Sequence, residues 1–263
     1  MPFLTITTDF GTKDGFVGTM KGVIWKICPD VQIADITQEV APQNVQEGAI
    51  ALWRAYSFFP AGTIHVAVVD PGVGTQRRAI AARLVEHYFV APDNGLLTPI
   101  IEDAEQKGLS INFVHLTNPA YWLQSISHTF HGRDIFAPVG AYLAKGIKLS
   151  ELGPEIKDVV RLPLPKPEKT ATGWKANIAV VDIFGNLATN LAASAVSGNS
   201  QLTFRVKGAE VKGLVASYGQ RQPGDLVALV DSEGFIEIAV VNGNAAKKLG
   251  AQVGDAVEVI VGQ

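Results

Sequence analysis

The chain is poor in cysteine, in dense charge and in long apolar runs, and each shortage excludes a class of protein. Its one cysteine, Cys28, excludes a disulfide within the chain, and the apolar run at residues 23–28 predicts a buried thiol. Twenty-two lysines and arginines against 25 aspartates and glutamates give a net charge of −3 without a dense basic run, which argues against a nucleic-acid partner. No apolar stretch approaches the roughly 20 residues that span a bilayer, and the N-terminus has no signal-peptide pattern. We therefore expect a cytoplasmic protein without a membrane partner.

The first 160 residues have the pattern of an α/β domain. Apolar residues make up 47% of the 263 residues and charged residues 18%, as in a folded globular chain. Short β-branched runs alternate with longer amphipathic stretches, which indicates βαβ units around a parallel sheet. The expected strands are residues 3–8, 31–36, 64–70, 88–91 and 111–116, with an added hairpin strand at 78–85. The expected helices are residues 15–27, 44–59, 95–106 and 134–145.

A connector and a second, β-rich domain follow. Three closely spaced prolines at residues 162–172 favour an extended connector. The strands expected beyond it are residues 177–182, 201–206, 214–218, 226–231, 235–241 and 256–261, with one helix at 244–249. We therefore predict an α/β fold class with two domains: a Rossmann-like α/β catalytic domain at residues 1–162 and a small β-barrel domain at residues 173–263.

Three polar clusters, at residues 9–14, 70–77 and 131–134, interrupt the N-terminal pattern. Asp9 and Asp70 follow predicted parallel strands, and ligands of open α/β sheets bind outside the carboxyl ends of such strands. Both carboxylates are therefore expected to face one pocket, although strand-end aspartates before glycine are also common turn residues. The sequence lacks the spacings of a phosphate loop, and His131 with Asp9 and Asp70 lacks a usual metal-ligand spacing, so we predict neither a metal site nor a cofactor.

Longer motifs resemble the S-adenosylmethionine hydroxide adenosyltransferases over nearly the whole chain. They are VDPGVGTQR at 69–77, APDNGLLT at 91–98, FHGRD at 130–134, DIFGN at 182–186, DSEG at 231–234 and NGNAA at 242–246. The resemblance implies an enzyme that hydrolyses S-adenosylmethionine (SAM) to adenosine and methionine, with SAM as the substrate and not as a cofactor. It also implies a homotrimer whose sites lie between the N-terminal domain of one subunit and the C-terminal domain of the next.

The catalytic residues implied by this resemblance are Asp70, Arg77 and His131. Water would attack the ribose carbon C5′ that carries the sulfonium, and the departure of neutral methionine would remove the positive charge. Arg77 stays protonated and cannot be the base, but it can hold Asp70 and a water or hydroxide. Because an arginine favours the charged form of a neighbouring carboxylate, Asp70 would be a weaker base, and the proton acceptor is open between Asp70 and His131.

The resemblance also implies contacts with the adenosine part of the substrate. Asp9 would hold the ribose hydroxyls, and Asn186 with the backbone of Val240 would contact the adenine edge. Phe184 and Tyr218 would form flat apolar walls, with ordinary core packing as the alternative for both.

The methionine part would be bound through its ammonium and carboxylate by Asp182, Ser232 and Glu237.

Two rival functions share the substrate. The related SAM-dependent halogenases resemble one another in an aromatic residue at the position of Asp70 and in an extra loop after the following strand, where this chain has a short turn at residues 86–87. A non-catalytic sensor of adenosine or SAM would need the pocket but not the three catalytic residues.

Overall fold

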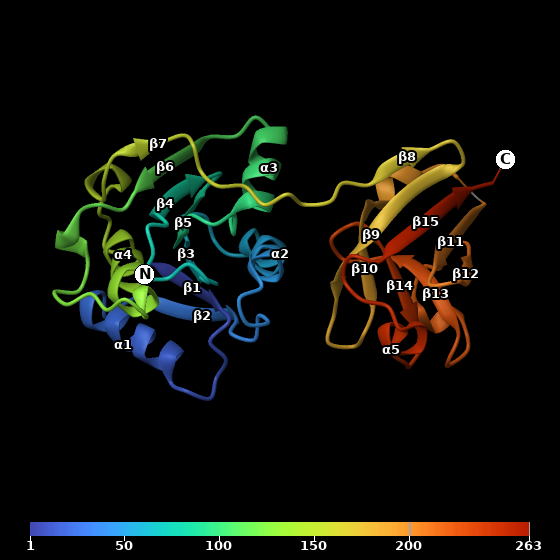
Figure 1. Cartoon of the computed structure of the whole chain (residues 1–263), viewed down its shortest axis with the longest axis horizontal. Coiled ribbons are helices and arrows are strands. Elements are labelled where there is room, and N and C mark those ends of the chain that lie inside the picture. The colour runs from blue at the N-terminus through green and yellow to red at the C-terminus, as the bar shows by residue number, and fades with distance from the viewer. Residues whose placement is uncertain (200, 263) are drawn as a thin grey trace. The chain divides into compact units, whose positions relative to one another are not determined.

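The computed structural model describes residues 1–199 and 201–262, which form two compact units (Figure 1). The first unit is Met1–Pro163, and the second begins at Leu164. Among the described residues, no helix combines the length and apolar character that a membrane span requires.

The described N-terminal unit contains a seven-stranded sheet in the order β2-β1-β3-β5-β4-β6-β7. Its strands are β1 (Phe3–Thr8), β2 (Gln32–Thr37), β3 (Ile64–Val68), β4 (Ala79–Leu84), β5 (His87–Pro92), β6 (Ile111–His115) and β7 (Glu155–Ile156). β1 pairs in parallel with β2 and β3, and β3 pairs in parallel with β5. β4 is antiparallel to β5 and β6, and β7 is antiparallel to β6. The carboxyl ends of β1, β3 and β5 therefore meet at one edge of the sheet.

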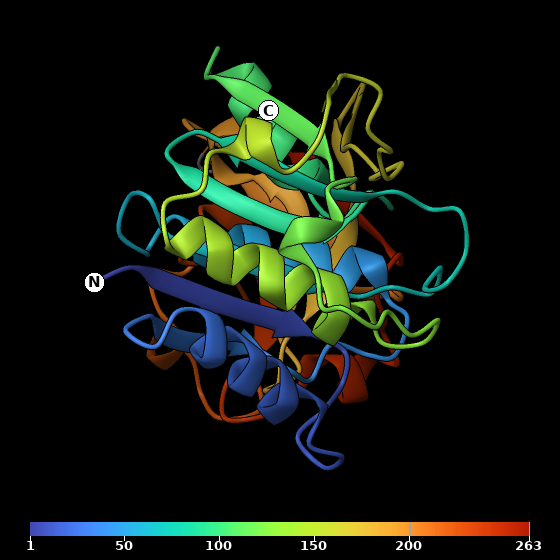
Figure 2. The same cartoon turned by 90° about the vertical axis from the view of Figure 1, so that its left-hand side faces the viewer.

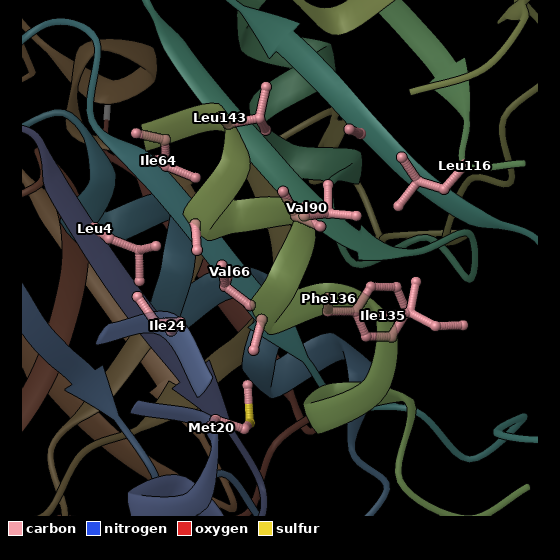
Figure 3. Packing of buried hydrophobic residues seen from close by; sticks show 14 of the residues in the cluster. Leu4, Met20, Ile24, Ile64, Val66, Val90, Leu116, Ile135, Phe136 and Leu143 are labelled. Carbon is pink, nitrogen blue, oxygen red and sulfur yellow. The ribbon is translucent and has the colours of Figure 1, made fainter. Parts of the chain in front are cut away.

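Helices cover both faces of this sheet. They are α1 (Phe16–Ile27), α2 (Val45–Tyr56), α3 (Thr98–Gln106) and α4 (Ala137–Ala144). α1 and α4 pack on one face, the near one in Figure 2, and α2 and α3 pack on the other. Met20 and Ile24 of α1 lie four residues apart and are fully buried, and Figure 3 shows them in the same cluster as Leu4 and Val66 of the sheet. The same cluster contains Phe136, the residue directly before α4.

The second unit is a nearly barrel-shaped antiparallel sheet in the order β12-β11-β15-β9-β10-β14-β13, with β8 paired to β9. Its strands are β8 (Glu168–Thr170), β9 (Gly173–Val181), β10 (Leu187–Ala192), β11 (Leu202–Val206), β12 (Ala209–Lys212), β13 (Leu226–Val230), β14 (Phe235–Val240) and β15 (Ala256–Val261). β12 and β13, at the two ends of this order, contact each other. Ile178, Leu187, Phe204, Ile238 and Val257 are buried inside, and the helix α5 (Ala245–Leu249) follows β14.

The observed elements differ from the expected ones at several places. β10, β7, β8 and β12 were not predicted, and the strand expected at residues 214–218 is irregular chain that leads into a 3₁₀ turn, Tyr218–Gln220. β10 has the sequence LATNLA, which carries few β-branched residues, so its strand conformation depends on pairing with β9 and β14. The helix expected at 134–145 begins as a short π-helical segment, Gly132–Phe136, before α4.

Candidate functional site

Asp9 and Asp70 lie at the same edge of the N-terminal sheet, as their positions after β1 and β3 predict. Thr8 is paired with Val68 where β1 and β3 lie side by side in parallel. The loop with Asp9 and the loop with Asp70 therefore begin at neighbouring positions. The Asp9 carboxylate accepts a hydrogen bond from the backbone N–H of Gln43 at 2.8 Å. This edge therefore carries two carboxylates, and that of Asp9 contacts the segment that precedes α2.

Asp70, Arg77 and His131 form one hydrogen-bonded chain. Arg77 Nε donates to Asp70 Oδ1 at 2.9 Å and to Oδ2 at 3.0 Å, and Arg77 Nη2 donates to Oδ2. Arg77 Nη2 also lies 3.0 Å from His131 Nδ1. The side chains of Asp70 and Arg77 are 4% and 11% exposed, so this ion pair is largely shielded from solvent. The arginine carbon Cζ lies 5.1 Å from the centre of the Phe136 ring, which fixes one face of the guanidinium.

Gly74 allows the loop after β3 to approach the loop that carries His131. Its φ of 75° lies in the left-handed region, which favours glycine. A Cβ atom at this position would lie 2.2 Å from the carbonyl oxygen of His128. The close packing of the two loops brings Arg77 and His131 together, and a larger residue at position 74 would separate them.

The His131 imidazole is held in its neutral form by its surroundings. Burial lowers the pKa of His131, and the Arg77 guanidinium lowers it further. The carboxylates of Asp70 and Asp134 and the backbone of Ser127 act in the opposite direction but do not restore the usual pKa. At neutral pH the site therefore contains a carboxylate, a guanidinium and an uncharged imidazole.

A turn after β5 supports the Asp70 strand, although the sequence analysis gave it no role. Asn94 Nδ2 donates to the carbonyl of Val69 at 2.8 Å. The buried carboxylate of Asp93 accepts from Arg78 Nε at 2.8 Å. Both contacts involve residues directly next to Asp70 and Arg77 in the sequence. Only the motif at residues 91–98 could have drawn attention to them.

A pocket of about 410 Å³ adjoins these loops in the N-terminal unit. It is lined by Phe10, Phe16, Ser127, Thr129, Phe130 and Arg133. Phe10 follows Asp9 and Phe130 precedes His131, so the pocket is one residue away from two of the predicted site residues. Its volume lies in the range of roughly 300–1,000 Å³ that is typical of small-ligand sites.

In the second unit, the turn between β9 and β10 is organised by Asp182. Its Oδ1 accepts from the backbone N–H groups of Phe184 and Asn186 at 2.9 and 2.8 Å, and its Oδ2 accepts from Asn186 Nδ2 at 2.9 Å. Gly185 has a φ of 84° and packs so closely on Asn244 that a Cβ would lie 2.1 Å from that side chain. The motifs at 182–186 and 242–246 therefore form one structural unit. Asp182 stabilises the turn itself, and Phe184 stands 71% exposed on it.

Tyr218 and Glu237 form a second polar group in this unit. The Tyr218 hydroxyl donates to Glu237 Oε1 at 2.7 Å, and Glu237 is buried in β14. Burial raises the pKa of Tyr218, and Glu237, Asp182 and Asp231 raise it further. Tyr218 is 42% exposed, so it is not the core residue of the alternative interpretation.

Val240 and Ser232 lie at opposite ends of β14. Leu187 pairs with Ile238, so Asn186 and Val240 lie near the same end of the β10–β14 pair, and the Val240 carbonyl accepts from the Gly243 N–H at 3.0 Å. Ser232 lies in the turn before β14 and donates to Glu233 Oε1 at 2.8 Å. The second unit therefore brings Asn186 and Val240 together and keeps Ser232 apart from them.

The described residues contain no group of three or more histidine, cysteine, aspartate or glutamate side chains that could hold a metal ion. In the N-terminal unit, Arg77 and Asp70 are the groups that can form directed hydrogen bonds to a small polar molecule. The Arg77 guanidinium is held by Asp70 and His131, so the hydrogen bonds that it donates have fixed directions, and the buried Asp70 carboxylate can accept hydrogen bonds.

Comparison with known proteins gives one consistent family. Residues 4–153 match the model of the SAM hydroxide adenosyltransferase N-terminal domain, and residues 176–258 match that of the C-terminal domain. A protein of Salinispora tropica named (R)-S-adenosyl-L-methionine hydrolase is 40% identical over 99% of this chain and 98% of its own. A fluorinase of Actinoplanes sp. is 29% identical over 90% of each chain. The crystal structure of an uncharacterised conserved protein from Thermotoga maritima matches with a TM-score of 0.89 and 38% identity, covering 98% of this chain and 99% of that one. The chain therefore belongs to the SAM hydroxide adenosyltransferase family.

Proposed function

We propose that this protein hydrolyses S-adenosyl-L-methionine to adenosine and L-methionine, by attack of water or hydroxide on the ribose C5′. The hydrogen-bonded chain of Asp70, Arg77 and His131 carries the proposal, because it provides a shielded, oriented set of groups for water at a ligand-binding sheet edge. The family and the names of its relatives supply the substrate.

The reaction balances without a cofactor. The water oxygen forms a bond to C5′ while the bond between C5′ and sulfur breaks, and its electron pair stays on sulfur. The sulfonium becomes a neutral thioether, and one proton of the water is lost. Because charge disappears from the substrate in this step, a site from which bulk water is largely excluded favours it. Asp70, Arg77 and His131 are the catalytic residues in this proposal, and no metal is required.

The substrate contacts follow the family resemblance. Asp9 binds the ribose hydroxyls, and Asn186 and the Val240 backbone bind adenine between the walls of Phe184 and Tyr218. Asp182, Ser232 and Glu237 bind the charged groups of methionine. Asn186 and Val240 already lie at one end of the same strand pair, which supports their shared role.

We assign residues 1–162 to a Rossmann-like catalytic domain and residues 173–263 to a β-barrel domain, in a homotrimer that acts in the cytoplasm. The turn next to Asp182 leaves Ile183 92% exposed and Phe184 71% exposed. Such apolar side chains beside recognition residues favour a site that is completed when another body covers them. A head-to-tail contact between neighbouring subunits, closing into a ring of three, provides this cover.

Both rival functions are less well supported. Asp70 and the short turn between β4 and β5 differ from the halogenase pattern described above, and the fluorinase relative is more distant than the hydrolase. A sensor has no need for the buried ion pair of Asp70 and Arg77.

The test is incubation of the purified protein with SAM in water enriched in heavy oxygen, with a chelator present and halide absent. We expect adenosine and methionine in equal amounts, with the heavy oxygen in adenosine. An Arg77→Ala variant serves as the control. Heavy oxygen in a product other than adenosine, or no cleavage at all, would overturn the proposal. Loss of activity with chelator and recovery with zinc would instead support a metal site.

A further inference from the structure

The loop at residues 69–78 carries both members of the buried ion pair, and one turn contacts both of its ends. This ion-pair loop is held by Asp93 and Asn94, which are consecutive residues directly after β5. Asn94 contacts Val69 at the first end, and Asp93 contacts Arg78 at the second. Val69 directly precedes the aspartate of the ion pair, and Arg78 directly follows its arginine. The turn therefore fixes the separation of the two ends of the loop.

A side-chain amide makes the contact at the first end. The ladder between β3 and β5 stops at the pair Val66 and Val90, so Val69 lies beyond it. Asn94 Nδ2 donates to the Val69 carbonyl at 2.8 Å. Asn94 Oδ1 accepts from the backbone N–H of Leu96 at 3.3 Å, which fixes the orientation of the amide because an N–H needs an acceptor. Val69 is fully buried, where a carbonyl without a hydrogen bond is costly, so this contact holds the main chain in place.

The contact at the second end uses both the backbone and the carboxylate of Asp93. Its N–H donates to the Arg78 carbonyl at 2.9 Å, which continues the hairpin one residue beyond the pair Ala79 and Pro92. Its Oδ2 accepts from Arg78 Nε at 2.8 Å and lies 2.7 Å from Nη2. Its Oδ1 accepts from the backbone N–H of Val160 at 2.8 Å. The side chain of Asp93 is 2% exposed, so both oxygens are committed to partners in a shielded place.

Arg78 has a second acidic partner at the surface. Its Nη1 donates to Asp158 Oδ1 at 2.8 Å, and its Nη2 donates to the Asp158 carbonyl at 2.6 Å. The side chain of Asp158 is 79% exposed, and ion pairs at the surface contribute little to holding a structure. Asp93 and Asp158 therefore bind the same guanidinium from a buried and an exposed position.

We propose that Asp93 and Asn94 are positioning residues: they fix both ends of the ion-pair loop and so set the geometry in which its aspartate and arginine meet water. This inference rests on the proposed function. Arg77 Nε donates to both oxygens of Asp70, at 2.9 and 3.0 Å, and such a forked contact depends on the relative orientation of the two groups. Movement of either end of the loop changes that orientation, and a displacement of about 1 Å can cost on the order of 100-fold in rate.

Two substitutions of unchanged size test the two ends separately. Asn94→Asp removes the donated hydrogen bond at the first end and retains an acceptor oxygen. Asp93→Asn removes the charge at the second end and places an amide NH₂ against a guanidinium or a backbone N–H, both of which need an acceptor. Asp158→Asn is the matched control, because it removes the exposed partner of the same arginine. Asn94 is only partly buried and uncharged, so Asn94→Asp decides the test if Asp93→Asn does not fold.

NMR of the protein with nitrogen-labelled arginine measures the geometry of the ion pair without turnover. An Arg77→Lys spectrum assigns the Nε–H signal of Arg77. This N–H is bonded to a shielded carboxylate, so we expect slow exchange with water in the unmodified protein. We expect this protection to be lost in Asn94→Asp and Asp93→Asn and retained in Asp158→Asn. Unchanged protection in either folded variant of the turn, or an equal loss in Asp158→Asn, would overturn the inference even if SAM is hydrolysed.

Steady-state kinetics measures the consequence for the proposed reaction. We expect Asn94→Asp and Asp93→Asn to lower kcat on the order of 100-fold with a smaller change in KM, because they displace the groups that orient water. Asp158→Asn should retain the activity of the unmodified protein. An unchanged kcat in a variant whose Nε–H has lost its protection would contradict a positioning role. Absence of hydrolysis in the unmodified protein, with the NMR result as expected, would instead refute the proposed function and leave the turn as the support of the ion pair.

Discussion

A buried histidine pair in the N-terminal sheet predicts a loss of stability in mild acid. His65 of β3 is fully buried, and its Nδ1 lies 2.7 Å from Thr5 Oγ1. Its Nε2 lies 3.2 Å from His87 Nδ1, and its ring stacks on Phe89 at 4.9 Å between ring centres. Burial, with a smaller contribution from His87, lowers the pKa of His65 to about 3.

The sign and size of the effect follow from proton linkage. In the unfolded chain His65 binds a proton near its ordinary pKa of about 6.5, whereas the folded form resists protonation until about pH 3. Between these values the unfolded state binds more protons, so the free energy of unfolding falls as the pH falls. From pH 7 to pH 5 this single group removes about 2 kcal/mol. Burial lowers the pKa of His87 as well, which adds to the loss in the same direction.

Hydrogen exchange of the amides of β3 at pH 7 and pH 5, corrected for intrinsic exchange rates, measures this loss within the N-terminal unit. The perturbation is His65→Gln, which removes the titrating group, with His128→Gln at an exposed position as the matched control. We expect protection to decline by about 2 kcal/mol less in His65→Gln than in the unmodified protein, and His128→Gln to follow the unmodified protein. An equal decline in all three would refute the reasoning, because the acid sensitivity would then not arise from His65.

Two further predictions concern the proposed site. Asp70→Ala should lower kcat by about 10³-fold or more while SAM binding, measured by calorimetry, changes little, because Asp70 acts on water; a parallel loss of binding would make it a substrate-binding residue. Mixing inactive Asp70→Ala with inactive Asn186→Ala protein under subunit exchange should restore activity, because mixed rings contain intact interfaces; a monomer by light scattering, or no recovery despite proven exchange, would show that each chain builds its own site.

The sequence predicted which residues lie at the ends of the parallel strands. It did not predict which residues hold the neighbouring loops in place. Asp9 and Asp70 could be placed together because parallel strands end on one side, and the ladder between β1 and β3 confirms this. Ser127 carries no such signal, since a serine in a loop is common and its hydrogen bonds to Asp134, seven residues later, depend on the fold of the loop. The motif at 130–134 contained Asp134, but the sequence alone did not show what it binds.

The second unit shows the same limit for secondary structure. β10 was missed because its residues have weak strand preference, and its conformation is decided by its two neighbours. The prediction of a strand at 214–218 was wrong for the opposite reason. Its apolar residues fitted a strand pattern, but the chain turns at Tyr218 and directs the hydroxyl to Glu237. In both places contacts distant in sequence override the local pattern.

The charges of the proposed catalytic residues and of the proposed substrate-binding residues fit a cationic substrate that loses its charge in the reaction. Asp70 and Arg77 neutralise each other, and burial with Arg77 keeps His131 uncharged, so these three side chains carry no net charge together. The proposed recognition residues Asp9, Asp182 and Glu237 are acidic. In the proposed function, acidic groups attract a sulfonium and an ammonium, while a neutral, shielded centre does not stabilise the sulfonium relative to the neutral thioether. The same reasoning gives Arg77 a role beside Asp70 in the proposed function: an uncompensated carboxylate at the reacting carbon would stabilise the cation that the reaction has to remove.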